Sequence, residues 1–197
     1  LHINGMQAFQ THVTHAPRTF QKESHTAFYI FVIYFALTAI CASLLRMSGM
    51  NPFDAICHAM ATLSTSGIST YADSVGHFNN LPIELIITVF MILGSLPFTL
   101  YLRALRGDGL SVIKDTQVQV LLKILITFSL LLAAYIVAKH EEQPLTALRH
   151  AMFTVTSFVT TTGFSVENNV QWGTPVILLV FLMSIIGGCA CSSSGGI

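Results

Sequence analysis

Two short hydroxyl-rich tracts with a central glycine are the residues of this sequence best suited to chemistry. They read Ser-Thr-Ser-Gly-Ile-Ser over 64–69 and Thr-Thr-Thr-Gly-Phe-Ser over 160–165. Backbone carbonyl and hydroxyl oxygens can replace the hydration shell of a potassium ion, and glycine allows the backbone angles that aim successive carbonyls inward. The tracts therefore predict a site that holds a dehydrated cation.

The composition places these tracts in a membrane protein. Of the 197 residues, 53% are hydrophobic and 9% are charged, and the mean hydropathy is +0.69. Soluble domains carry about 25% charged residues. The low charged fraction makes membrane lipid the expected surroundings, and the formal net charge of zero argues against nucleic acid as a partner.

Two kinds of apolar segment surround the tracts. Long stretches with at most one charge approach or exceed the ~20 residues that cross a bilayer as a helix; they are 26–45, 85–102, 118–138 and 168–197. Two shorter segments, 52–63 and 144–159, begin with the proline favoured in a first helical turn and reach only ~18–24 Å. We expect these to be half-helices that enter the membrane and stop at the tracts.

The order long, short, long occurs twice, and the two halves align. Nine residues from Pro52 (Pro-Phe-Asp-Ala-Ile-Cys-His-Ala-Met) share five identities with nine from Pro144 (Pro-Leu-Thr-Ala-Leu-Arg-His-Ala-Met). The offset is 92 at these prolines (144 − 52) and 96 at Gly67 and Gly163 (163 − 67). The second half-helix is therefore longer by about one turn, or its entry to the tract differs. The pattern predicts an all-α membrane protein of repeated span, half-helix, tract and span.

The repeat sets the expected organisation of the chain. The chain starts without Met and stops within a Gly/Ser tract, so we interpret it as an internal piece of a longer polypeptide. The expected parts are the end of a preceding repeat's second helix (1–10), a cytoplasmic linker (11–25), one repeat (26–106, with half-helix 52–63, tract 64–69 and span 82–105), a second linker (107–117) and a further repeat (118–197, with half-helix 144–159, tract 160–165 and a span from 174).

The half-helices add an electrostatic argument for a cation. Each points its C-terminal end, which carries roughly −0.5 of an elementary charge, at its tract. Acidic residues fall on the outer side of the expected topology and would form an acidic vestibule that concentrates cations, unless they are ordinary solvated loop residues: Asp54, Asp73, Glu84, Glu141, Glu142 and Glu167. The alternative for the tracts is a small-residue face for helix packing.

Three other features have competing interpretations. His58 and His150 occupy matching positions, and satisfied polar contacts near the outer interface are favoured over haem ligation. The four cysteines favour buried thiols over disulfides, and Cys189-x-Cys191 lacks the further ligands of a metal site. A Gly/Ser-rich stretch over 187–196 is a poor helix and is expected to form a flexible gate loop below the second tract, or else a close-packing helix. The first repeat has only a kink-forming Gly-Ser-Leu-Pro at 94–97.

The tracts and the stretch 187–196 resemble those of the TrkH/KtrB superfamily of potassium-uptake subunits, and most strongly those of TrkH. This superfamily is related to fungal Trk and plant HKT transporters. The resemblance covers essentially the whole chain. Gly5-Met6-Gln7 looks like the end of an earlier repeat's second helix. Departures are Ser66 and Ile68, where Gly and Phe are common, and Cys191, where the loop has Gly.

The resemblance implies four repeats around one pore, of which this chain holds two. It implies a potassium filter and an intramembrane gate. The filter residues are Thr65, Ser66, Gly67, Thr161, Thr162 and Gly163, with the Ile68 and Phe164 backbone; the gate residues are Gly187, Gly188, Ser192, Ser193, Ser194, Gly195 and Gly196. K+ is the transported ion, and no organic cofactor is expected.

The resemblance also implies partners and a location. The expected partners are the remaining repeats of the same polypeptide, a second copy in a homodimer and a cytoplasmic nucleotide-binding ring of TrkA or KtrA type. The expected location is the bacterial inner membrane. An enzyme is not expected, because no catalytic constellation lies within the spans. The alternative function is a secondary transporter of another cation or small solute, including a Na+-permeable relative, that uses the broken helices as its site.

Overall fold

The computed structural model describes residues 20–105, 114–140, 143–166 and 173–195, and its regular elements there are helices. This confirms the expected all-α class. The expected helix end at 1–10, most of both linkers (11–19 and 107–113) and Gly196 lie outside the described residues. Helices of the first repeat are α2 (Phe20–Met47), α3 (Pro52–Leu63), the 3-10 helix η1 (Ser74–Phe78), α4 (Leu81–Gly94) and α5 (Phe98–Leu105).

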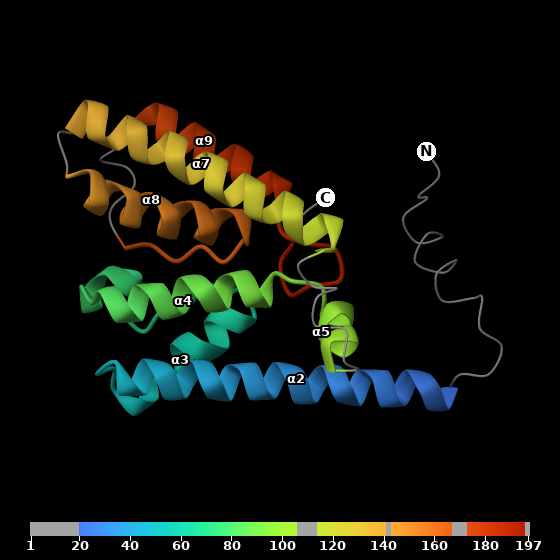
Figure 1. Cartoon of the computed structure of the whole chain (residues 1–197). Coiled ribbons are helices and arrows are strands. Elements are labelled where there is room, and N and C mark those ends of the chain that lie inside the picture. The colour runs from blue at the N-terminus through green and yellow to red at the C-terminus, as the bar shows by residue number, and fades with distance from the viewer. Residues whose placement is uncertain (1–19, 106–113, 141–142, 167–172, 196–197) are drawn as a thin grey trace.

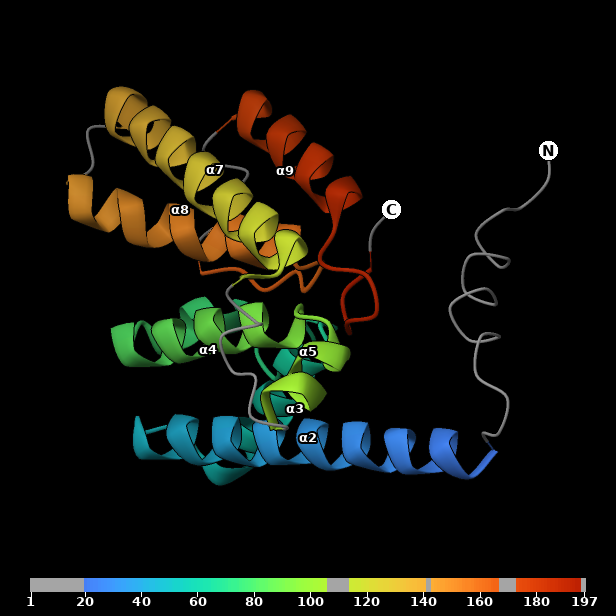
Figure 2. The ribbon, with the colours of Figure 1, turned by 45° about the vertical axis from the view of Figure 1, so that its right-hand side comes forward.

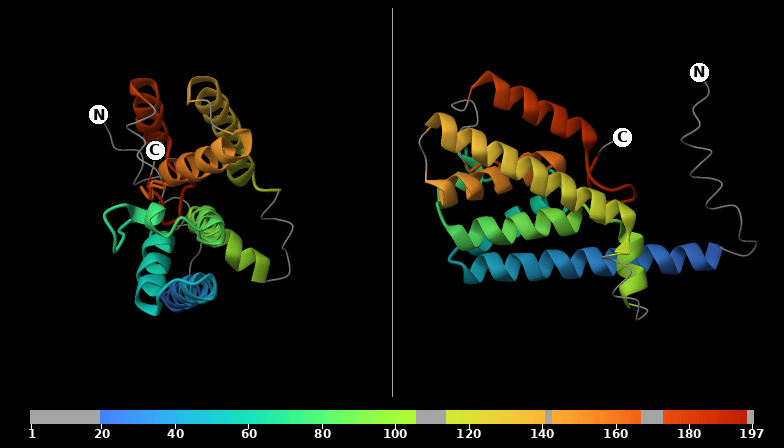
Figure 3. Two further views of the ribbon diagram at one scale, coloured as in Figure 1. Left: turned by 90° about the vertical axis from the view of Figure 1, so that its left-hand side faces the viewer. Right: turned by 45° about the horizontal axis from the view of Figure 1, so that its top comes forward.

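The second repeat contains α7 (Thr116–His140), α8 (Pro144–Val159) and α9 (Thr174–Ile186). Figure 1 shows two groups of helices, with α2 to α5 below and α7 to α9 above, and the turned views of Figures 2 and 3 keep this division. Within the groups α2 packs on α3 and α7 on α8, and between them α4 packs on α8. The ribbon colours show α2 and α7 running in the same direction, as expected of parallel repeats (Figure 1).

Two described helices are long and apolar enough to cross a membrane, over Ala27–Met47 and Thr116–Lys139. The expected span 82–105 is instead divided. Helix α4 ends at Gly94, α5 begins at Phe98, and the two are bent by 91°. Pro97 lacks the amide hydrogen and disfavours a helical conformation for the residue before it, so the expected kink is a complete break. Helix α9 likewise ends before Gly187, the residue aligned with Gly94 (187 − 94 = 93), so the repeats differ less here than expected.

The buried core of each repeat includes side chains from the other repeat. One buried cluster is built mainly from α2, α3 and α4 but includes Phe153 and Phe164 of the other repeat, which are 1% and 0% exposed. A second cluster is built mainly from α7, α8 and α9 but includes Leu96 and Leu100 from the break and α5. Burial of these side chains holds the repeats, and so the two tracts, together.

Candidate ion site

Both half-helices begin at their prolines. Helix α3 has 12 residues from Pro52 and α8 has 16 from Pro144. The difference of four residues equals the change in repeat offset from 92 to 96. The extra turn therefore lies within α8, which decides between the two explanations offered by the sequence.

Beyond this turn three backbone hydrogen bonds of the first tract recur in the second at an offset of 96. The first bond, from Ser64 N to Met60 O, has its equivalent from Thr160 N to Thr156 O. The remaining pairs follow the same rule: Thr65 N to Thr62 O and Thr161 N to Phe158 O, then Ser66 N to Ala61 O and Thr162 N to Ser157 O. The first and third residues of each tract are also joined through their hydroxyls, at 3.1 Å in Ser64–Ser66 and 2.8 Å in Thr160–Thr162. The tracts are thus equivalent structures as well as similar sequences.

The sign of φ alternates along each tract. Within 64–68 only Thr65 (φ +50°) and Gly67 (φ +63°) are positive, and within 160–164 only Thr161 (φ +56°) and Gly163 (φ +86°). A left-handed conformation is rare for a β-branched residue and costs about 1–3 kcal/mol, typically at functional sites. Two equivalent threonines carry this strain.

Alternating left- and right-handed residues turn successive N–H groups to one side of the chain and the carbonyls to the other. Here the N–H groups face the half-helix, since Thr162 N and Gly163 N both donate to Ser157 O, at 2.8 and 3.1 Å. The carbonyls therefore face away from α8. Phe164 differs from the expectation, because its carbonyl accepts a hydrogen bond of 2.7 Å from Ser157 Oγ and is turned toward α8.

The two tracts lie against each other at Gly67. A Cβ atom on Gly67 would stand 2.0 Å from the carbonyl oxygen of Thr162, whereas a Cβ on Gly163 would meet no atom within 4 Å. Gly67 is therefore required both by its φ and by the close approach of the second tract. Gly163 is required by its φ alone.

The Gly/Ser stretch after α9 forms a loop that contacts the break between α4 and α5. Three backbone bonds of 3.1–3.2 Å join the loop to the break: Cys189 N to Ser95 O, Ser193 N to Gly94 O and Phe98 N to Cys191 O. The neck of the loop is closed by Gly188 N donating to Gly195 O at 3.1 Å. Figure 2 shows this loop beside α5 and the end of the tract that follows α8. Cys191 has φ +60°, a conformation that suits the glycine expected at this position.

The same loop touches both tracts. Thr65 Oγ1 donates to Ser193 O at 3.0 Å, and Gly195 N donates to Thr161 Oγ1 at 3.0 Å. The structure thus brings together the sequence-predicted residues of the two tracts and those of the loop. Of the gate residues, Gly196 alone falls outside the described part of the chain.

Residues 19–139 match the profile of the TrkH family, described as a cation transport protein. The chain belongs to the TrkH family. Trk system potassium uptake protein TrkI of Halomonas elongata is 34% identical over 198 residues, 100% of this chain and 40% of the relative. TrkH of Vibrio parahaemolyticus is 34% identical over 210 residues, 100% of this chain and 42% of the relative.

A solved structure gives the same result. The crystal structure of the potassium transporter TrkH from Vibrio parahaemolyticus matches with a TM-score of 0.85 at 32% identity, over 90% of this chain and 39% of that one. The chain therefore spans about two fifths of the length of the TrkH-family relatives it matches. As a TrkH-family chain with two candidate spans, it is an integral membrane protein.

In this TrkH-family chain a buried carboxylate holds the segment that follows the first tract. Asp54, 5% exposed, accepts hydrogen bonds from Thr70 Oγ1 at 2.8 Å and from the Tyr71 hydroxyl at 3.0 Å. The hydrogen bond to Asp54, together with burial and the carboxylate's charge, raises the pKa of the Tyr71 phenol. Asp54 therefore has structural hydrogen-bond partners, whereas its expected place was an acidic vestibule.

His58 supports the same segment. Its Nδ1 donates to the Asp54 carbonyl at 2.8 Å, since a carbonyl only accepts, and its Nε2 is hydrogen-bonded to Ser69 Oγ at 2.9 Å. The ring is 0% exposed and stacks on Phe164 of the second tract at 5.9 Å between centroids. Both ring nitrogens are therefore engaged in polar contacts, the interpretation favoured from the sequence over haem ligation.

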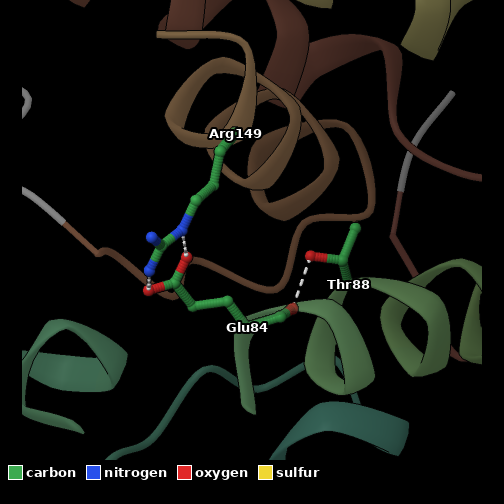
Figure 4. Close-up of polar contacts among 3 residues, drawn as sticks. All are labelled: Glu84, Thr88 and Arg149. Carbon is green, nitrogen blue, oxygen red and sulfur yellow. Dashed lines mark hydrogen bonds and ion pairs between the residues drawn. The ribbon is translucent and has the colours of Figure 1, made fainter. Parts of the chain in front are cut away.

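Glu84 is a second expected vestibule acid that has a structural partner. It lies on α4, is 2% exposed and receives two hydrogen bonds from Arg149 of α8, from Nε at 2.6 Å and from Nη2 at 2.5 Å (Figure 4). Among the six expected vestibule acids, Asp73 is exposed, while Glu141, Glu142 and Glu167 are not among the described residues. One feature of the sequence could have pointed to this pair. Arg149 is charged, whereas the aligned residue of the other repeat is the uncharged Cys57 (149 − 92 = 57).

Proposed function

We propose that the polypeptide containing this chain takes up potassium ions across the bacterial inner membrane, and that this chain supplies two of four filter strands. The filter residues are Thr65, Ser66, Gly67, Thr161, Thr162 and Gly163, with the Ile68 backbone. The relatives named above are called potassium uptake proteins or a potassium transporter. Potassium is the transported ion, and no organic cofactor takes part. The protein moves an ion and catalyses no reaction.

The observation that carries this proposal is the matched alternation of φ in two tracts that lie against each other. Positive φ at Thr65 and Gly67 recurs at Thr161 and Gly163. Carbonyls turned away from the half-helices are placed to coordinate a cation, and the C-terminal ends of α3 and α8 add negative potential behind them. A helix-packing face would not need two strained threonines at equivalent positions.

The loop from Gly187 to Gly196 is proposed as the gate on the inner side of the filter. Its described residues reach both tracts and the break after α4 through the hydrogen bonds given above. A loop that is bonded to two filter strands blocks ions leaving them, and its displacement opens the path. The dimer, the further repeats and a cytoplasmic nucleotide-binding ring of TrkA or KtrA type remain part of the proposal.

The competing function is a secondary transporter of another cation or small solute, including a Na+-permeable relative. Inverted repeats would favour such a transporter. The two repeats described here run in the same direction (Figure 3), and the ends of both half-helices meet the same loop. This arrangement favours a pore with one axis.

Growth of a bacterium that lacks its own potassium uptake tests the proposal. The full-length polypeptide should restore growth at low potassium and take up K+ in preference to Na+, and Gly163→Ser should lower that preference. Gly49→Ser is the matched control, because Gly49 also has positive φ (+98°) and no atom within 4 Å of its Cβ position, but lies outside the tracts. Failure to restore growth, or an unchanged ion preference in Gly163→Ser, would refute the filter.

A further inference from the structure

Two equivalent hydroxyls contact the gate loop, one from each tract. Thr65 and Thr161 are separated by the repeat offset of 96, and each makes one hydrogen bond of 3.0 Å to the backbone of the loop. Thr65 donates to the Ser193 carbonyl, whereas Thr161 accepts from the Gly195 amide. Both threonines also have positive φ, +50° at Thr65 and +56° at Thr161. The strained conformation is thus linked to contact with the loop.

We propose that Thr65 and Thr161 form a latch that couples the gate loop to the occupancy of the filter. This inference rests on the proposed function, since it gives these two filter residues a second role. The latch is the pair of hydroxyl contacts itself. When the loop is displaced, the two hydroxyls lose their partners, so gate position and filter chemistry change together.

The direction of the coupling follows from the Thr65 hydroxyl. A hydroxyl has one hydrogen to donate and two lone pairs, and Thr65 gives its hydrogen to Ser193 O. Its lone pairs are then left for a cation. A cation at Thr65 Oγ1 in turn repels the hydroxyl hydrogen and favours its donation to the loop. At the Thr65 contact, ion occupancy and loop docking therefore stabilise each other, and this coupling is reciprocal.

The loop does not depend on the latch for its fold. Its three backbone bonds to Gly94, Ser95 and Phe98 involve no atom of either tract, and its neck is closed by the bond between Gly188 and Gly195. Loss of one latch contact should therefore loosen the contact of the loop with the α4–α5 break without unfolding the loop. A reporter inside the loop can measure this change.

Cys189 is a natural reporter. It lies in the loop, is 7% exposed, and carries a free thiol, whereas Cys191 in the same loop is exposed. In the full-length polypeptide a water-soluble maleimide should modify Cys189 slowly, with Cys191 as the internal reference in site-resolved mass spectrometry. Thr65→Val removes the hydroxyl and should speed modification of Cys189 about fivefold, as expected for one hydrogen bond. Thr65→Ser keeps the hydroxyl and should leave the rate unchanged.

A second pair of variants changes the loop and leaves every filter residue unsubstituted. Gly195→Pro removes the amide hydrogen that Thr161 accepts, while Gly195→Ala keeps it and places a Cβ atom 3.7 Å from Thr161 Oγ1, an ordinary contact. The proline variant should speed Cys189 modification and the alanine variant should not. This pair remains informative if Thr65→Val fails to fold.

The ion dependence separates the latch from the proposed function. Potassium should slow modification of Cys189 relative to N-methylglucamine, and Thr65→Val should abolish that protection. Equal modification rates within both variant pairs, or potassium protection that survives Thr65→Val, would overturn the latch even if potassium uptake is intact. A latch that shows no potassium protection in the unsubstituted protein would instead count against the potassium filter and against the coupling.

Discussion

Glu84 of α4 and Arg149 of α8 form a doubly hydrogen-bonded ion pair that joins one repeat to the next (Figure 4). The side chain of Glu84 is 3% exposed and that of Arg149 is 27% exposed. Charged residues inside a membrane protein are costly unless they are paired. The pair therefore fixes the half-helix α8 of the second repeat against α4 of the first.

Removal of one partner should destabilise the protein more than removal of both. Glu84→Gln leaves the Arg149 charge without its carboxylate, and breaking a buried pair in this way costs about 3–5 kcal/mol. Replacement of both residues by methionine should recover much of that loss, because no buried charge remains. Thermal unfolding of the purified polypeptide in detergent measures both. The exposed Asp73→Asn serves as control, and a Glu84→Gln midpoint equal to the control would contradict a structural role for the pair.

The two tract glycines should respond unequally to alanine. Gly163→Ala adds a methyl group where no atom lies within 4 Å, so its cost is that of a left-handed alanine, about 1–2 kcal/mol. Gly67→Ala adds the same strain and places the methyl group 2.0 Å from the Thr162 carbonyl oxygen. Forced shifts of packed backbone add about 1–3 kcal/mol. Unfolding measurements on both variants should rank Gly67→Ala as the more damaging, and equal losses would show that the tracts do not approach each other there.

Much of the fold follows from local sequence signals. The prolines at 52 and 144 mark helix starts because proline suits the first turn, and both helices begin there. The change in repeat offset implied an extra turn, which α8 contains. The glycines at 67 and 163 signalled positive φ, but the same conformation at Thr65 and Thr161 had no sequence signal, because β-branched residues disfavour it.

Contacts between the repeats could not be predicted from local sequence patterns. Glu84 and Arg149 are 65 residues apart, and each alone is compatible with a solvated outer loop. Their pairing depends on how α4 packs on α8, which hydrophobic patterning does not specify. The bonds between the gate loop and Gly94, Ser95 and Phe98 have the same origin. The sequence placed a kink and a loop at aligned positions but gave no reason for them to touch.

Shortening the loop should raise ion flux. Deletion of residues 191–194 removes the Ser193 carbonyl and amide and the Cys191 carbonyl, and with them one latch contact and two of the three bonds to the α4–α5 break. The path below the filter is then open more of the time. Potassium uptake by cells that express the full-length polypeptide provides the measurement. Ala190→Ser changes an exposed loop residue outside the named gate residues, keeps the loop length and is the control; flux that stays at the control level after the deletion would assign the loop a packing role.

Asp54 should stabilise the first tract through the segment that follows it. Its carboxylate accepts from Thr70 and Tyr71, and hydrogen bonds to a charged group contribute about 1.5–3 kcal/mol each where they are buried. Thr70 is exposed, so water replaces part of the loss, and Asp54→Ala should cost about 1–3 kcal/mol in total. Asp54→Asn keeps one acceptor oxygen and should cost less.

The functional result of Asp54→Ala should appear in ion preference. The segment 69–71 continues directly from the tract, and Ser69 is also held by His58 at 2.9 Å. With the carboxylate gone, the outer end of the tract keeps the His58–Ser69 hydrogen bond and the stacking of Tyr71 on His77 but loses two hydrogen bonds, and looser carbonyls discriminate less between ions of different size. The ratio of K+ to Na+ uptake should therefore fall in Asp54→Ala and fall less in Asp54→Asn. An unfolding loss of the expected size with an unchanged ratio would show that Asp54 stabilises the outer segment without positioning the filter.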